Sequence, residues 1–294
     1  MADRAARFDA AGLDTARFEF GRNWRRFLGR LNDARIEIAE RALVAMLGPH
    51  GLEDRRFLDV GSGSGLSSLA ARRLGARVHA FDYDAQSVAC TMELRRRYFP
   101  ADPRWTVERG SVLDADYLAR LGRFDVVYSW GVLHHTGAMW QALENVERVV
   151  APGGKLFLAL YADQGAKSRF WWWVKRTSVA LPRPLRVPWA LLVATPFELR
   201  MATLELARGE WRRYLASWAH YETARGMSRW HDMIDWMGGF PYEVASPSRV
   251  TRFYEARGYT TRIVHPTGGA GCIEYVFERP SAHAVDVGRS AHAG

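Results

Sequence analysis

Residues 57–66 read Phe57-Leu58-Asp59-Val60-Gly61-Ser62-Gly63-Ser64-Gly65-Leu66. The apolar run ends in an acidic residue, three glycines alternate with serines, and a helical pattern starts at once. Glycines permit a tight turn and let a ligand approach the backbone closely. A dinucleotide-binding fingerprint would have glycine where Leu66 stands, and a phosphate loop would have Lys-Ser or Lys-Thr. Asp59 would repel a diphosphate, but it suits a ligand with an ammonium group.

Short apolar runs and helical patterns alternate over the first half of the chain and return near its end. Alternation of this kind predicts parallel strands joined by right-handed crossovers, with helices on both faces of a sheet. Ser246-Pro247 predicts the start of a helix before the last two strands. The predicted strands are residues 56–60, 77–81, 104–108, 124–129, 155–161, 259–264 and 272–278.

Five segments in order, up to residue 161, resemble the motifs of the class I S-adenosylmethionine-dependent methyltransferases. The resemblance implies an α/β fold: a Rossmann-like seven-stranded sheet, mostly parallel, with an antiparallel last strand and a helical lid inserted after the fifth strand. It implies S-adenosyl-L-methionine as cofactor and S-adenosyl-L-homocysteine as product. The segments are the glycine loop, Phe81-Asp82, Gly110-Ser111-Val112, Phe124-Asp125-Val126-Val127-Tyr128-Ser129-Trp130-Gly131-Val132-Leu133-His134-His135, and Val150-Ala151-Pro152-Gly153-Gly154-Lys155-Leu156.

The same resemblance implies roles for individual residues. Asp82 would bind both ribose hydroxyls and Tyr83 would pack on the adenine. The segment with Ser111 would meet the adenine edge, although many family members carry an acidic residue at that position. The segment after the fourth strand would meet the methionine part. The predicted cofactor-binding residues are Asp59, Gly61, Ser62, Gly63, Gly65, Asp82, Tyr83, Ser111, Val112, Ser129 and Trp130.

The sequence divides into four predicted parts. Residues 1–50 form an N-terminal helical cap, residues 51–161 and 246–280 form the cofactor-binding core, and residues 281–294 are a disordered tail. Residues 162–245, where the strand pattern stops, form a helical substrate lid. Within the lid, Thr195-Pro196-Phe197-Glu198 predicts a helix start, with a capping box and proline at the first helical position.

Candidate bases for the acceptor are few. A hydroxyl acceptor needs a group that takes its proton, and histidine titrates near neutrality. His134, with its neighbour His135, follows the fourth strand at the expected mouth of the cofactor cleft. In the lid, His231 and Asp232 are a second candidate pair, unless they are structural contacts. The predicted catalytic residues are therefore His134, His231 and Asp232, and no metal is expected, because too few ligands gather in the sequence.

Aromatic residues are concentrated in the predicted lid. Tryptophan can stack on a flat acceptor or lie at a membrane interface. Basic residues flank the run, so an amphipathic surface that faces lipid is one alternative. The other alternative is that the indoles form the core of the lid itself. The residues concerned are Phe170, Trp171, Trp172, Trp173 and Trp189.

Composition narrows the remaining classes of protein. The 294 residues carry 41 basic and 32 acidic side chains, a formal charge of +9, spread along the chain. Two cysteines cannot build a disulfide framework, and residues 187–197, the longest apolar stretch outside the strands, are too short to span a bilayer. No signal peptide is recognised, so a cytoplasmic location is expected.

These observations predict an enzyme that methylates a small-molecule acceptor, with O-methylation of a sugar, aromatic compound or natural-product intermediate as the favoured reaction. The first alternative is a lipid or isoprenoid acceptor at the membrane surface. The second is a protein that binds the cofactor without catalysis. No nucleic-acid partner and no integral membrane association are expected, whereas peripheral contact stays open, as does the oligomeric state.

Overall fold

The computed structural model describes residues 31–48, 52–219, 236–266 and 271–281. The chain divides into two compact units. One contains Gly21–Gln164 and Glu243–Gly294, and the other takes in Gly165–Tyr242. We call the first the sheet unit and the second the helical unit.

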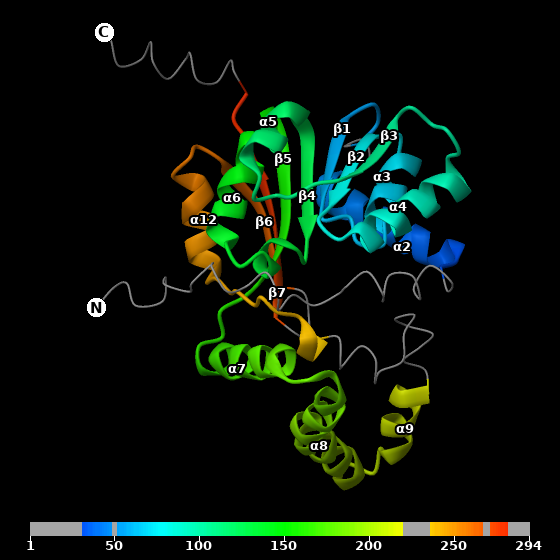
Figure 1. The fold of residues 1–294 in the computed structure, drawn as a ribbon, viewed down its shortest axis with the longest axis vertical. Coiled ribbons are helices and arrows are strands. Elements are labelled where there is room, and N and C mark those ends of the chain that lie inside the picture. Colours follow the sequence, from blue (N-terminus) through cyan, green and yellow to red (C-terminus); the bar gives the residue numbers. More distant parts are fainter. Residues whose placement is uncertain (1–30, 49–51, 220–235, 267–270, 282–294) are drawn as a thin grey trace. The chain divides into compact units, whose positions relative to one another are not determined.

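A seven-stranded sheet runs through the sheet unit in the order β3-β2-β1-β4-β5-β7-β6 (Figure 1). Strands β1 to β5 pair in parallel, whereas β7 pairs antiparallel with both β5 and β6. The predicted mostly parallel sheet with an antiparallel last strand is thereby confirmed. The strands are β1 Arg56–Val60, β2 Arg77–Asp82, β3 Trp105–Arg109, β4 Phe124–Trp130, β5 Val150–Tyr161, β6 Thr260–Pro266 and β7 Cys272–Glu278.

Helices cover both faces of this sheet (Figure 1). Successive strand residues point to opposite faces, so Phe57 and Leu58 of β1 enter two different apolar cores. The core around Phe57 includes α2, α3 and α4, and the core around Leu58 includes α5, α6 and α12. These helices are α2 Asp33–Leu47, α3 Leu66–Arg73, α4 Ala85–Tyr98, α5 Ala115–Leu121, α6 Met139–Arg148 and α12 Pro247–Glu255.

The chain leaves the sheet unit after β5 and returns to it close to the same point. Ala162 and Ala245 form a parallel bridge, and the Asp163 N–H donates to the Ala245 carbonyl at 3.0 Å. The Ala162 N–H donates to the Gly271 carbonyl at 2.7 Å. Hydrogen bonds therefore tie both ends of the inserted segment to the end of β5.

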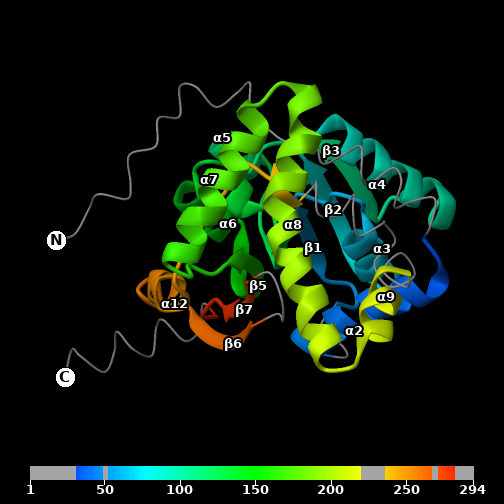
Figure 2. The same ribbon diagram turned by 90° about the horizontal axis from the view of Figure 1, so that it is seen from below.

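The helical unit contains α7 Ala166–Ala180, α8 Arg183–Ala207 and α9 Trp211–Ala219 (Figure 2). Val174 of α7 packs with Ala190 and Ala194 of α8 in a small apolar core. The Trp189 indole N–H donates to the Val174 carbonyl at 3.3 Å. Trp171 joins this core with Trp236, at 4.3 Å between ring centroids.

The predicted helix start at Thr195-Pro196 is wrong, because α8 continues through both Pro188 and Pro196. Proline lacks the N–H that would reach the carbonyl four residues earlier, and an interior proline usually kinks or ends a helix. Here Ala190 and Ala194, between the two prolines, hold the helix on α7. The Thr195 hydroxyl donates to the Leu191 carbonyl at 2.7 Å instead of capping a helix N-terminus.

Several sequence predictions concern ends that the structure describes in part. Of the predicted N-terminal cap it describes α2, whose N-cap Asn32 accepts from the Arg35 N–H at 3.1 Å. Of the predicted tail, only Ser281 lies within the described residues. The boundaries and the lid role of residues 162–245 stay predictions. In the part of the chain that the structure describes, no helix has the length and apolar character needed to cross a membrane.

Candidate functional site

The glycine loop lies at the edge where the parallel strands end, which we call the carboxyl edge. Gly61, Gly63 and Gly65 have φ values of +79°, +55° and +81°, a region that side chains with a Cβ disfavour. The Gly61 N–H donates to the Phe81 carbonyl at 2.9 Å, and the Gly65 N–H donates to the Ser62 carbonyl at 2.8 Å. The loop thus folds back on the end of β2 before α3 begins.

Close packing explains why glycine occupies the first of these positions. A Cβ on Gly61 would lie 2.4 Å from Cγ1 of Val132, which follows β4. The sequence alone predicted a close approach of a ligand at this point, whereas the structure places the Val132 side chain there. Val132 is thus part of the site's framework that sequence reasoning did not single out.

Asp82 ends β2 and is joined to the glycine loop. One carboxylate oxygen accepts from the Gly63 N–H and the other accepts from the Asp84 N–H, both at 2.9 Å. Burial raises the pKa of Asp82 to about 6, although these backbone hydrogen bonds lower it. Each oxygen has a second lone pair, so the carboxylate can still accept from two hydroxyl groups of a ligand.

Asp59 is buried in β1, at 2% exposure. Its carboxylate accepts from the Ser68 hydroxyl of α3 at 2.6 Å. Burial raises the pKa of Asp59 to about 7, and the nearby Asp82 adds to the rise while Ser68 opposes it. Among the described residues, no cationic side chain is a cause of either shift. A cationic ligand beside these two carboxylates would therefore favour their charged forms.

Two serines fasten neighbouring segments of the carboxyl edge. The Ser129 hydroxyl of β4 donates to the Val60 carbonyl at 3.0 Å. Ser62 and Thr91 of α4 share a hydroxyl–hydroxyl hydrogen bond at 2.9 Å, and Thr91 also donates to the Ser87 carbonyl at 3.2 Å. The cofactor-binding role predicted for Ser62 and Ser129 stays a prediction, while their printed contacts stabilise the loop and the strand ends.

The predicted adenine-side residues follow β2 and β3. Tyr83 is 48% exposed, and the Arg109 guanidinium lies 5.6 Å from the centre of its ring. Ser111 accepts from the Leu113 N–H at 3.2 Å in a short turn. Val112 is buried, and its carbonyl accepts from Asn145 at 3.0 Å. Tyr83 is thus the member of this group whose side chain is most open to a ligand.

Trp130, at the end of β4, is 46% exposed. Its indole N–H donates to a carboxylate oxygen of Glu274 in β7 at 2.7 Å. His265 of β6 lies beside the other oxygen of Glu274, at 3.8 Å. The sequence gave Glu274 only as a minor candidate, because pairing between β5 and β7 was needed to bring it to Trp130.

The predicted catalytic residues differ in what the structure describes. His134 lies in the short helix η2, Leu133–His135, and is 1% exposed. Its ring accepts from the Tyr161 N–H at 3.4 Å and lies 4.1 Å from the Tyr161 ring centroid. His134 thus contacts the end of β5 rather than open solvent. His231 and Asp232 lie outside the described residues.

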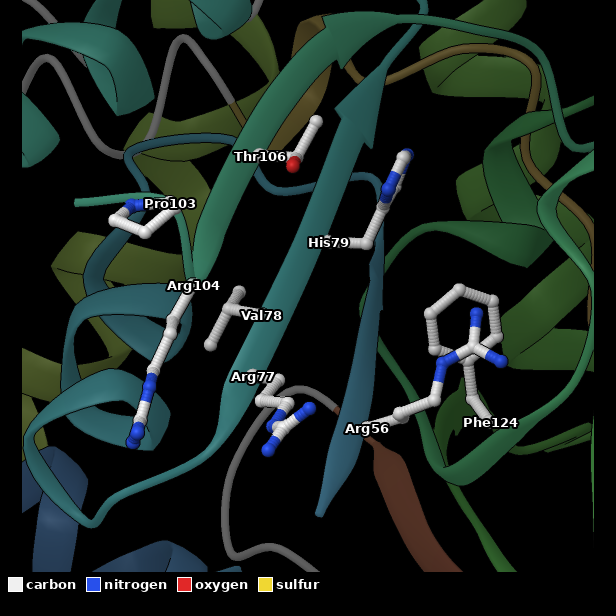
Figure 3. A pocket seen from close by; sticks show the side chains of 8 residues that line it. All are labelled: Arg56, Arg77, Val78, His79, Pro103, Arg104, Thr106 and Phe124. Atoms are coloured by element: carbon white, nitrogen blue, oxygen red, sulfur yellow. The ribbon is translucent and has the colours of Figure 1, made fainter. Parts of the chain in front are cut away.

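The opposite edge of the sheet, where the strands begin, carries a separate basic pocket (Figure 3). Arg56 begins β1 and Phe124 begins β4, and the Arg56 guanidinium lies 4.6 Å from the centre of the Phe124 ring. The pocket is therefore distinct from the glycine loop, which follows the end of β1. Among the described residues, no group of three His, Cys, Asp or Glu side chains is placed to hold a metal ion.

The strand order, the glycine loop after β1 and the acidic end of β2 together define a class I methyltransferase domain. Residues 58–158 match the family model described as a methyltransferase domain. This domain belongs to the class I S-adenosylmethionine-dependent methyltransferases, as the sequence motifs indicated, and the cofactor of that class is S-adenosylmethionine.

Curated relatives resemble this chain over part of their length. A tRNA U34 carboxymethyltransferase of Methylococcus capsulatus is 32% identical over 136 residues, which are 46% of this chain and 40% of the relative. A ubiquinone biosynthesis O-methyltransferase of Parvibaculum lavamentivorans is 29% identical over 172 residues, 54% of this chain and 65% of the relative. The chain thus spans less than two thirds of either relative.

A solved structure shares the fold. The magnesium protoporphyrin IX methyltransferase of Synechocystis PCC 6803, with bound S-adenosylhomocysteine, superposes with a TM-score of 0.52 at 14% identity. The match covers 88% of this chain and 93% of that one. At this identity the likeness supports the architecture and leaves the acceptor open.

Proposed function

We propose that the protein transfers the methyl group of S-adenosylmethionine to a hydroxyl group of a small-molecule acceptor. The observation that carries the proposal is the Asp82 carboxylate, held at the carboxyl edge by the Gly63 and Asp84 N–H groups. Its remaining lone pairs suit the two neighbouring hydroxyls of a ribose. Ligands of open α/β sheets bind beyond this edge.

The charges of the site suit this cofactor. Asp59 and Asp82 both have raised pKa values because they are buried. S-Adenosylmethionine carries cationic groups and, when bound, supplies an electrophilic methyl group on its sulfonium. A cation nearby lowers the pKa of a carboxyl. We therefore propose that Asp82 binds the ribose and that Asp59 favours the cationic methionine part through its negative charge.

On the acceptor side, the residues must align a hydroxyl with the methyl group and remove its proton. Alignment supplies a large part of the acceleration in such a transfer. We propose His231 as the base, with Asp232 beside it. For His134, burial and the hydrogen bond from Tyr161 support a positioning role, in which its ring fixes the segment after β4.

A variant series tests these roles. His231→Ala is expected to lower turnover while leaving the affinity for S-adenosylmethionine unchanged. His134→Ala is expected to lower both, because the segment after β4 would lose its contact with β5. Unchanged turnover in His231→Ala would remove that residue from the mechanism.

A labelled-methyl assay tests the function itself. The protein and S-adenosylmethionine with a radiolabelled methyl group are added to a cell extract, which is then separated into aqueous, lipid and macromolecular fractions. The proposal predicts label in small molecules of the aqueous fraction, and Asp82→Ala serves as the matched inactive control. Label in the macromolecular fraction would contradict it. Cofactor binding without label in any fraction would indicate a binding protein that does not catalyse.

A lipid or isoprenoid acceptor is the second candidate. It is supported by the similarity to a ubiquinone biosynthesis O-methyltransferase and by large apolar side chains exposed on the helical unit. In the same assay this candidate predicts label in the lipid fraction.

A further inference from the structure

Exposed apolar side chains are concentrated in the helical unit. Among the described residues, 19 large apolar side chains are exposed, and 13 of them lie between Phe170 and Leu215. A surface of this kind usually marks an interaction site, because isolated soluble domains rarely expose large contiguous apolar patches. The 13 are Phe170, Trp173, Leu185, Val187, Leu191, Leu192, Phe197, Leu199, Met201, Leu204, Leu206, Trp211 and Leu215.

Helix α8 contains the most regular part of this surface. Leucines recur every seven residues at 185, 192, 199 and 206, with exposures of 50%, 68%, 60% and 64%. A seven-residue step returns to nearly the same side of a helix, drifting by only about 20°. Pro188, Thr195 and Ala202 lie between them on the same side and carry no charge. We call this side of α8 the leucine face.

The other side of α8 is already occupied. Ala190 and Ala194 are buried against α7, with Trp189 beside them. The leucine face is therefore not needed for the core of the helical unit. Its leucines gain free energy only if another apolar surface covers them.

The charge of the same segment indicates what that surface is. Residues 165–219 contain ten Lys and Arg and three Glu, a formal charge of +7, whereas the whole chain carries +9. Lys167, Arg169, Arg200 and Arg212 are among the exposed basic residues. An apolar helix face with Leu and Trp, accompanied by many basic residues, is typical of helices that lie in the interface of an anionic membrane.

A second copy of the chain fits these observations less well. A leucine zipper needs apolar side chains at both core positions of each heptad. Three residues after successive leucines stand Pro188, Thr195 and Ala202, which supply few apolar atoms. Two copies of a segment with charge +7 would also repel one another, whereas anionic lipid headgroups attract it.

We propose that the leucine face of α8 docks the protein on the surface of an anionic lipid bilayer. The helix would lie along the interface, with its leucines in the acyl boundary and the basic residues of α7, α8 and α9 near the headgroups. The proposal concerns membrane attachment and holds for a water-soluble as well as a lipid acceptor.

Vesicle co-sedimentation tests this proposal with the full chain. Vesicles of phosphatidylcholine with phosphatidylglycerol are compared with vesicles of phosphatidylcholine alone, at low and high salt. The protein is expected to pellet with the anionic vesicles, and less so at high salt, because salt screens the charge contribution. A protein that stays in the supernatant with anionic vesicles overturns the proposal.

Two double variants locate the surface. Leu192→Glu with Leu199→Glu is expected to lower vesicle binding more than about tenfold, since two buried leucines are lost. Ile38→Glu with Met92→Glu, at 58% and 47% exposed positions of the sheet unit, is the matched control and is expected to bind like the parent. Equal loss in both, or no loss in the first, overturns the assignment to α8.

Further readouts keep the outcomes distinct. Arg200→Glu with Arg212→Glu is expected to remove the preference for phosphatidylglycerol, and it carries the test if the leucine variant fails to fold. A dimer that the leucine variant dissociates, without vesicle binding by the parent, would show that a second copy covers the face and would overturn the proposal. Vesicle binding is measured without turnover, so its failure leaves the proposed methyl transfer standing.

Discussion

Replacing Gly61 with alanine should destabilise the sheet unit through two separable effects. The first is backbone strain, because Gly61 has φ +79°, where a Cβ costs about 1–2 kcal/mol. The second is a clash, because the new Cβ would lie 2.4 Å and 2.6 Å from the two γ-methyl groups of Val132. Overpacking of this kind costs about 1–3 kcal/mol. Together they predict a loss of roughly 2–5 kcal/mol of the free energy of unfolding.

Two further variants separate these effects. Gly131 has φ +74° and a Cβ built on it meets nothing within 4 Å, so Gly131→Ala should show the backbone cost alone, about 1–2 kcal/mol. Val132→Ala removes both γ-methyl groups from the path of the new Cβ. The Gly61→Ala, Val132→Ala double variant should therefore be more stable than the sum of its single changes by about 1–3 kcal/mol.

Urea unfolding followed by far-ultraviolet circular dichroism measures all four proteins. The reasoning is refuted if Gly61→Ala and Gly131→Ala cost the same, or if Val132→Ala adds fully to Gly61→Ala. Either result would mean that the contact between the glycine loop and the segment after β4 does not determine the choice of glycine at position 61.

Two buried ionisable groups give pH-dependent predictions. Asp59 has its pKa raised from 3.8 to about 7 by burial, so the free energy of unfolding should fall as pH rises from about 4 to 7, and Asp59→Asn should reduce this fall. Urea midpoints across this range measure it, and an equal slope in the variant would contradict it. Lys175 donates to the Trp236 carbonyl and lies 4.2 Å from the centre of the Trp236 ring, and burial lowers its pKa to about 7. The helical unit should therefore lose stability as pH falls from about 10 to 7, and Lys175→Met should flatten this dependence in near-ultraviolet circular dichroism melts. A parent protein without that loss would refute the buried environment of the amine.

The sheet and the glycine loop could be predicted from the sequence because their signals are local. Apolar runs of strand length, glycines at fixed spacing and Asp82 at a strand end indicate the topology before any tertiary contact is known. The strand predictions agree with the structure most closely at β1 and β7, where Arg56–Val60 and Cys272–Glu278 match the predicted ranges.

The remaining features depend on tertiary neighbours. The helix start expected at Pro196 failed because packing on α7 outweighs the local cost of proline in α8. Trp171 was a candidate for acceptor or lipid contact, yet it packs with Trp236 inside the helical unit. The leucines of α8 look like ordinary core residues in the sequence, and only their exposure distinguishes them.

Binding of the cofactor tests the central claim most directly. Calorimetric titration of S-adenosylhomocysteine into the parent protein should show one site, and Asp82→Ala should lower the affinity by roughly a hundredfold, because two hydrogen bonds to a charged group are lost. Asp82→Asn controls for the support of the Gly63 N–H, and Asp125→Ala removes a carboxylate from the opposite edge, where it accepts from the Arg56 N–H at 2.9 Å. The account predicts loss at Asp82 with unchanged binding in Asp125→Ala. Equal affinity in the parent protein and in a folded Asp82→Ala variant would contradict it.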